Sequence, residues 1–214
     1  MIEYPSIAFS AKAPRKRMVA FDKLDGSNFR AKWVAGKGFV GYGTRTQLIN
    51  EDTEYWGDMV RCFKTRYQTP LEQHLNITLK TSKGQKPVQE AVIFGEYLGP
   101  NSFAGKHCDG ADAMRIVFFD VLLGKKQRKF LLPYEFIDYL GDVVEIPRVI
   151  YEGNLTKEFI TEIVSSTELN EGVICKGCER SGAYSGNVWM CKIKTQAYLD
   201  RLKETFKESW KKYV

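Results

Sequence analysis

The order of the short apolar runs along the chain constrains its fold more than any other feature. Runs with strand character recur between residues 18 and 194, and segments with helical spacing lie among and after them. Because strands and helices do not alternate one for one, the pattern predicts an α+β fold with mainly antiparallel sheets and flanking helices. The expected strands are MVAFDKLDGSNFRAKWVA (strand, turn, strand), EAVIFGEYLG, MRIVFFDVLL, EGVICKG and NVWMCKIKT, and the expected helices are 51–83, 133–141, 156–167 and 198–214.

Length and composition favour one domain over residues 1–214. No apolar run approaches the roughly 18 residues of a membrane span, and the N-terminus lacks the apolar core of a secretory signal. The five cysteines are an odd number and do not resemble a secreted disulfide framework. These features predict a cytoplasmic monomer without a membrane partner.

Positive charge is in excess, with a formal net charge of +6. An anionic partner is therefore favoured, although basic charge alone is weak evidence for nucleic-acid binding. The charge gathers in two places. One is a basic cluster before the first strand, Arg15, Lys16 and Arg17, and the other is a stripe on the last predicted helix, Lys203, Lys207 and Lys211. Each of these two basic groups is either a solvent-exposed face without a partner or a surface that binds a polynucleotide.

The segment Lys23-Leu-Asp-Gly-Ser-Asn28 lies where the first strand meets a turn. A lysine is a nucleophile only when it is neutral, so its pKa must fall through desolvation or nearby cations. A lysine at the end of a strand is held against the packed interior of the protein, and Gly26 allows a tight turn beside Asp25. Taken alone, the segment is equally an ordinary hairpin turn with an exposed lysine.

Four later segments carry charged or aromatic residues in strand contexts. Glu96 lies between glycines in FGEYLG, and Phe119 lies in FFDV, where a ring can stack on a purine. Glu171 and Lys176 are five apart, so they point to opposite faces of a regular strand unless the strand bends or Glu171 precedes it. Lys192 and Lys194 share one strand face, an arrangement that is costly without an anion such as phosphate between them.

These segments together resemble the covalent nucleotidyltransferase superfamily of polynucleotide ligases and mRNA capping enzymes. KLDGSN resembles motif I, FGEYLG motif III, VFFDV motif IIIa, EGVICK motif IV and KIK motif V, and Arg45 resembles the arginine that follows motif I. Asn28 and the segment EIPRVIYEG are most similar to the phage-type RNA ligases that repair nicked duplex RNA. The resemblance implies a nucleotidyltransferase (ATP-grasp-like) adenylation domain and an RNA ligase that joins 3′-hydroxyl and 5′-phosphate ends.

The resemblance also implies a role for each motif residue. Lys23 attacks the α-phosphorus of ATP and becomes a lysyl–AMP, Glu96 holds the ribose hydroxyls as an ionised carboxylate, and Phe119 stacks on adenine. Lys192 and Lys194 neutralise the α-phosphate and help keep Lys23 unprotonated, and Glu171 organises Mg²⁺ or Mn²⁺. The remaining implied contacts are Lys176 with the same phosphate, Asp22, Leu24 and Arg45 with the nucleotide, Asp25 with the metal, and Asn28 and Arg45 with the nucleic acid.

Only 20 residues follow Lys194 in this sequence. An OB domain or a separate C-terminal domain is therefore not expected, and a minimal catalytic domain is. ATP is favoured over NAD as the donor because 22 residues precede Lys23. The leaving pyrophosphate must then be oriented by the catalytic domain itself, and the hypothesis is that Arg15, Lys16 and Arg17 help with this or with the polynucleotide.

Several alternatives remain at this point. Phe118 rivals Phe119 as the stacking ring, depending on strand phase. Cys175 and Cys178, with His107 and Cys108, could form a zinc site, although coincidence is the better interpretation. The function could be that of a minimal ATP-dependent DNA ligase, a capping-type guanylyltransferase that uses GTP, or a nucleic-acid-binding module without catalysis. If the source is viral, the compartment is the host cytoplasm.

Overall fold

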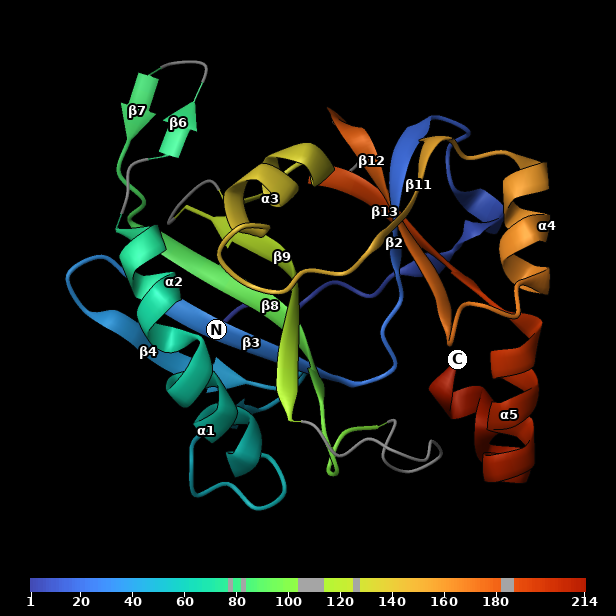
Figure 1. The fold of residues 1–214 in the computed structure, drawn as a ribbon, viewed down its shortest axis with the longest axis horizontal. Helices are drawn as coiled ribbons and strands as arrows, with labels where there is room; N and C mark the ends of the chain where they lie inside the picture. The colour runs from blue at the N-terminus through green and yellow to red at the C-terminus, as the bar shows by residue number, and fades with distance from the viewer. Residues whose placement is uncertain (77–78, 82–83, 104–113, 125–127, 182–186) are drawn as a thin grey trace.

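The computed structural model describes residues 1–76, 79–81, 84–103, 114–124, 128–181 and 187–214. Two sheets dominate the fold and lie side by side (Figure 1). The five-stranded sheet has the order β1 (Ala8–Phe9), β13 (Asn187–Lys194), β12 (Gly172–Ser181), β2 (Arg17–Asp22) and β11 (Val149–Asn154). The six-stranded sheet has the order β10 (Lys129–Phe130), β9 (Arg115–Leu123), β8 (Glu90–Leu98), β3 (Ser27–Val34), β4 (Gly38–Gly43) and β5 (Leu48–Ile49).

Most strand pairs are antiparallel, as predicted for an α+β fold. The β1–β13 pair is parallel, whereas every other described pair in the two sheets is antiparallel. A separate two-stranded ribbon joins β6 (Leu79–Thr81) to β7 (Gly84–Lys86). The fold class predicted from the order of the apolar runs is confirmed.

The chain passes from one sheet to the other between β2 and β3, at residues 23–26. Strand β2 is buried on both faces because it belongs to two cores. Val19 and Phe21 lie in the core that faces β3 and β8, whereas Met18 and Ala20 lie in the core under α4. This division follows the two-residue period of a strand. The short link that ends β2 is therefore fixed by packing on both sides of that strand.

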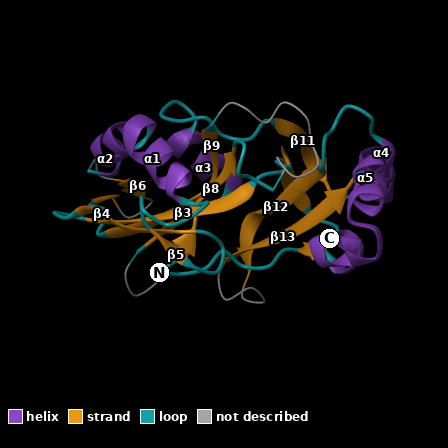
Figure 2. Ribbon diagram, turned by 90° about the horizontal axis from the view of Figure 1, so that it is seen from below, coloured by secondary structure: helices purple, strands orange, loops and turns teal. Residues whose placement is uncertain are grey.

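Helices pack on both sheets (Figure 2). The helices α1 (Gly57–Arg66), α2 (Gln68–Leu75) and α3 (Pro133–Leu140) contribute buried residues to the core of the six-stranded sheet. Helix α4 (Lys157–Ser165) packs on β12 and β13, and α5 (Gln196–Phe206) contacts α4. Two 3₁₀ segments, η1 (Ser10–Lys12) and η4 (Lys207–Tyr213), complete the described elements.

Two predicted helices differ from the structure. The segment 51–83 contains α1, α2 and strand β6, because the apolar period holds only as far as Leu75. The helix predicted over 198–214 ends at Phe206, because Lys207 has φ 44° and breaks the helical backbone. No helix in the described ranges is long and apolar enough to span a bilayer.

Candidate active site

The link between the two sheets places Lys23 directly after β2. Its backbone N–H donates to the Gly172 carbonyl at 2.9 Å, which extends the β2–β12 ladder by one residue. Gly26 then passes close to β8, where an added Cβ would collide with the Tyr97 carbonyl and the Glu96 side chain. The Gly26 N–H donates to Glu96 Oε1 at 3.0 Å. Motif I is therefore fastened to both sheets.

Glu171 reaches the same place because it lies just before β12. Gly172, the first residue of that strand, has φ +141°, and a Cβ there would collide with the Ile193 carbonyl. Only glycine adopts this backbone without strain. Glu171 and Lys176 could serve one site if the strand bends between them or if Glu171 precedes the strand. The structure shows the second arrangement, with Glu171 ahead of β12.

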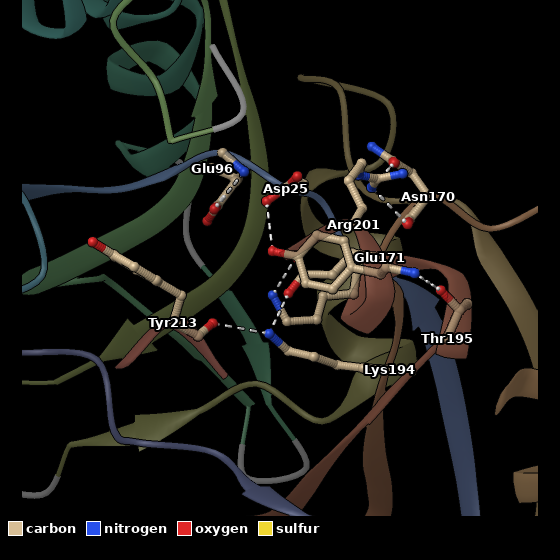
Figure 3. Close-up of polar contacts among 11 residues, drawn as sticks. Asp25, Glu96, Asn170, Glu171, Lys194, Thr195, Arg201 and Tyr213 are labelled. Carbon is tan, nitrogen blue, oxygen red and sulfur yellow. Dashed lines mark hydrogen bonds and ion pairs between the residues drawn. The ribbon is translucent and has the colours of Figure 1, made fainter. Parts of the chain in front are cut away.

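Glu171 forms the centre of a buried charge cluster. Its Oε2 lies 2.7 Å from Lys23 Nζ and its Oε1 lies 3.0 Å from Lys194 Nζ. The Glu171 and Lys194 side chains are 3% and 4% exposed, and the Lys23 side chain is 22% exposed. Figure 3 shows Lys194 reaching both Glu171 and the Tyr213 carbonyl. Lys23 is thus neither in bulk solvent nor far from the paired lysines.

The charge state of Lys23 differs from the sequence-based expectation. Desolvation lowers the pKa of Lys23, but the hydrogen-bonded charge of Glu171, with smaller contributions from Asp25 and from Glu96 when it is ionised, outweighs it, so the pKa is raised above its ordinary value. The amine is therefore an ammonium ion in this structure. The expectation of an uncharged amine is wrong for this state, because the Glu171 carboxylate contacts Lys23 Nζ at 2.7 Å.

Lys192 and Lys194 both line the same cavity, as their two-residue spacing predicts. Burial, together with repulsion from Lys194 and Lys23, lowers the pKa of Lys192. Burial also lowers the pKa of Lys194, against the attraction of Glu171. Lys192 Nζ lies 4.6 Å from the centroid of the Phe9 ring. These crowded ammonium groups form a site that favours an anion.

Glu96 has an unexpected protonation state. Burial, with a smaller contribution from the negative charge of Glu171, raises the pKa of Glu96 to about 8, against the attraction of Lys23. At neutral pH the carboxyl group is therefore mostly protonated in this structure. The expectation of an ionised carboxylate does not hold here, although a protonated carboxyl can still donate to one hydroxyl and accept from another.

Phe119 lines the cavity, whereas Phe118 is fully buried in the main core. The structure therefore resolves which ring faces the cavity. Lys176 Nζ contacts the Phe119 carbonyl at 2.6 Å and Asp120 Oδ2 at 2.9 Å. Tyr4 packs edge-on against Phe119 and donates to Asp120 Oδ2 at 2.8 Å. Lys176 lines the cavity, but its charge is balanced by Asp120, so its predicted contact with phosphate stays a prediction.

Sequence reasoning missed three residues of this site. Asp120 interrupts the apolar run VFFDVLL, and a carboxylate in a buried strand is a signal that a cation lies nearby. Tyr198 begins the helix expected over 198–214, and its hydroxyl donates to Asp25 Oδ1 at 3.0 Å while its ring lies 4.7 Å from Lys194 Nζ. Tyr4 gave no signal in the sequence.

The predicted residues converge on one cavity of about 540 Å³. Two of the residues that line this cavity also make contacts at the protein surface. Asp22 pairs with Arg148 at 3.2 Å, and Arg45 donates to Ser6 Oγ at 3.2 Å. The cavity is lined by these predicted residues: Asp22, Lys23, Leu24, Asp25, Asn28, Arg45, Glu96, Phe119, Glu171, Lys176, Lys192 and Lys194.

The basic cluster of Arg15, Lys16 and Arg17 does not join this cavity. The three residues line a different hollow, with Asn154, at the start of β2. Lys23 follows the other end of that strand, so about 20 Å of extended chain separates it from Arg17. The placement does not support a role of the cluster in orienting pyrophosphate. Its role with a polynucleotide stays a prediction.

The cysteines considered for zinc do not converge where they are described. Cys175 is buried in the core under α4 and lies opposite Cys191 in the β12–β13 ladder. Cys178 packs against the other core. His107 and Cys108 lie outside the described residues. The better interpretation of the CxxC spacing, coincidence, fits the positions of Cys175 and Cys178.

Comparisons with known proteins identify the family and the fold. A family model described as RNA ligase matches residues 16–194. Among curated proteins, no sequence match is found. The fold is similar to that of a Naegleria gruberi RNA ligase with pyrophosphate (TM-score 0.67, 17% identity, 95% of this chain). It is also similar to a variant with ATP and Mn (0.68, 15%, 94%) and to an apo variant (0.68, 14%, 94%). Each match covers 58% of the Naegleria chain, so this chain spans little more than half of that length.

Proposed function

This chain belongs to the RNA ligase family, and from that premise we propose that it is an ATP-dependent ligase that joins RNA 3′-hydroxyl and 5′-phosphate ends. The observation that carries the proposal is the position of Lys23. Its amine lies in the cavity, 2.7 Å from Glu171, and Glu171 in turn binds Lys194. An amine surrounded by cations and carboxylates in a nucleotide-sized cavity suits covalent nucleotidyl transfer.

In the first step, Lys23 Nζ forms a bond to the α-phosphorus of ATP while the bond from that phosphorus to the bridging oxygen breaks. Pyrophosphate leaves with the electron pair of the broken bond. The amine must lose its proton before it attacks, and Glu171 Oε2 at 2.7 Å is the nearest acceptor. Lys192 and Lys194 face the charge that builds on the α-phosphate oxygens.

In the second step, an oxygen of the nucleic acid's 5′-phosphate forms a bond to the AMP phosphorus while the bond from that phosphorus to Lys23 Nζ breaks, and its electron pair returns to the Lys23 amine. The 3′-hydroxyl then attacks that 5′-phosphate and AMP leaves, which forms the phosphodiester bond. Asn28 and Arg45 line the cavity where the polynucleotide end would enter. Arg15, Lys16 and Arg17, at the far end of β2, would bind the sugar–phosphate backbone only if the polynucleotide extends along that sheet.

The aromatic end of the cavity fits adenine. Phe119 lines that end, while Lys176 donates to the Phe119 carbonyl and the Tyr4 ring lies T-shaped to the Phe119 ring, with centroids 4.9 Å apart. Stacking on a ring whose position is fixed by these contacts costs little conformational entropy. Asp22 and Leu24, on either side of the nucleophile, complete this end of the nucleotide site.

The predicted metal is Mg²⁺ or Mn²⁺, although the described residues contain no group of three or more His, Cys, Asp or Glu side chains placed to hold an ion together. Asp25, Glu96 and Glu171 bring carboxyl oxygens to the cavity, and hard oxygen ligands suit both ions. Asp25 and Glu171 are the residues that would hold the ion. A bound ion supplies positive charge that shields phosphate and favours the neutral form of Lys23. We propose a monomer in a reducing compartment, and the four described cysteines, which are all free, are consistent with that compartment.

The proposal is tested by label transfer and by sealing. The expected result is label from the α-phosphate of ATP on the protein, none from GTP, and sealing of nicked duplexes that carry an RNA 3′-hydroxyl. Lys23→Ala removes both activities, and Lys37→Ala, an exposed lysine outside the cavity, keeps both. Sealing of DNA alone would indicate a DNA ligase, labelling by GTP a capping-type enzyme, and no labelling a binding module.

A further inference from the structure

The segment that follows α5 turns back toward the two sheets instead of continuing the helix. Figures 1 and 2 show the C-terminal end beside β13 and not beyond the far end of α5. The turn occurs at Lys207, whose φ of 44° is rare for a residue with a side chain. The 3₁₀ segment η4 therefore lies against the active-site cavity, where Lys212 and Tyr213 form part of the wall.

A cluster of three rings fastens η4 in this position. The Tyr213 ring centroid lies 4.3 Å from that of Phe206 and 5.4 Å from that of Phe103. Phe103 also donates its backbone N–H to Ser27 Oγ at 2.9 Å, and Ser27 belongs to the segment that carries the nucleophile. The cluster thus connects η4 to the link between the two sheets.

The backbone of η4 reaches the catalytic lysines directly. The Tyr213 carbonyl accepts a hydrogen bond from Lys194 Nζ at 3.2 Å. Lys194 is the residue that also binds Glu171, which binds Lys23. A carbonyl oxygen that accepts from a buried ammonium lies where a phosphate oxygen would accept the same bond. Lys212, the neighbouring residue, is exposed and brings a further positive charge to this side of the cavity.

The chemistry of the first step calls for a cation here. In nucleotidyl transfer the attacking and leaving groups lie roughly in line, and charge builds on the leaving pyrophosphate. The attacking group is Lys23, and the α-phosphate is met by Lys192 and Lys194. The cluster of Arg15, Lys16 and Arg17 lines a different hollow. Two other cations of the wall are occupied, because Arg45 donates to Ser6 and Lys176 pairs with Asp120. Among the lysines and arginines that line the cavity, this leaves Lys212 to meet the β- and γ-phosphates.

We propose that η4 forms the pyrophosphate side of the nucleotide site and that Lys212 binds the β- and γ-phosphates of ATP. This assignment rests on the proposed ligase function and adds a residue to it. ATP oxygens replace the Tyr213 carbonyl on Lys194, and the Lys212 ammonium pairs with the phosphates that leave. Lys212 acts only while a triphosphate or pyrophosphate is bound, so it serves the first step and not the sealing step.

Kinetics of the separate steps test the assignment. Lys212→Ala is compared with Lys211→Ala, which removes the same charge one residue away from an exposed lysine outside the cavity wall. We expect Lys212→Ala to raise the KM for ATP in lysyl–AMP formation about tenfold, the loss of one charge-assisted contact of about 1.4 kcal/mol. Sealing of pre-adenylylated RNA without ATP stays within about twofold of wild type, and Lys212→Arg retains most of the ATP affinity.

Binding measurements keep this test separate from that of the proposed function. In a Lys23→Ala background, which cannot react, Lys212→Ala should weaken ATP binding about tenfold and leave AMP binding unchanged. Equal behaviour of Lys212→Ala and Lys211→Ala would overturn the assignment. So would an equal loss in both reaction steps, which would place Lys212 on the RNA. If wild-type protein binds ATP but forms no lysyl–AMP, the proposed function fails while the binding comparison still decides the role of Lys212.

Discussion

Neutralising Glu171 should destabilise the protein through two lysines at once. The carboxylate lies 2.7 Å from Lys23 Nζ and 3.0 Å from Lys194 Nζ. At an effective dielectric constant of about 20, each contact is worth roughly 6 kcal/mol before desolvation. Desolvation offsets most of this, and removing one partner of a buried pair costs about 3–5 kcal/mol. Glu171→Gln keeps the shape and should therefore lower the free energy of unfolding at pH 7 by about 3–5 kcal/mol.

The loss should also depend on pH. Without the carboxylate charge, the pKa values of Lys23 and Lys194 fall, since Glu171 is the largest influence that raises each of them. The folded variant then releases protons below the ordinary lysine pKa of about 10.4, while the unfolded chain keeps them. The unfolded state binds more protons in that window, so stability rises with pH. The deficit of Glu171→Gln should shrink between pH 7 and about pH 10.

Urea denaturation at several pH values measures both effects. Glu145→Gln is the matched control, because Glu145 pairs with Arg115 at 3.6 Å with both side chains about half exposed. An exposed pair contributes about 0–1 kcal/mol, so the control should change little. The reasoning is refuted if Glu171→Gln costs no more than Glu145→Gln, or if its deficit grows as the pH rises.

Three further predictions concern the walls of the cavity. Glu96→Gln should flatten the pH dependence of stability between about pH 4.5 and 8. The raised pKa of Glu96 makes the wild-type protein lose at most about 1.4 kcal/mol of unfolding free energy per pH unit as the pH rises through that window. Equal slopes for the two proteins in urea titrations would contradict this. Tyr198→Phe removes the donor to Asp25 and should cost about 1–3 kcal/mol and slow lysyl–AMP formation; unchanged stability and rate would argue against this contact. Lys176→Met leaves Asp120 buried without its cation and should cost about 3–5 kcal/mol, part of which Asp120→Asn restores; additive losses would exclude the pairing.

Local patterns in the sequence predicted the strands and the convergence of the motifs. The two-residue period placed Lys192 and Lys194 on one face, and the five-residue spacing reduced the position of Glu171 to two possibilities. The choice between them depends on the backbone of Gly172, whose φ of +141° is set by its approach to β13. Spacing alone does not contain that information.

What the sequence did not predict depends on contacts between distant segments. The sequence predicted one helix over 198–214, but the chain leaves the helix at Lys207, and Tyr213 of η4 packs against Phe103. The charge of Lys23 likewise depends on a balance among side chains from both sheets. Such balances arise from tertiary packing, which changes the pKa of a group without any local signal in the sequence.

The central claim is that Lys23 is the residue that becomes covalently bonded to AMP. Intact mass measurement after incubation with ATP and Mg²⁺ tests it most directly. We expect a gain of one AMP per chain, reversal of that gain by added pyrophosphate, and no gain in Lys23→Ala. An AMP adduct that persists in Lys23→Ala, or wild-type protein that stays unmodified with ATP and either metal, would contradict it.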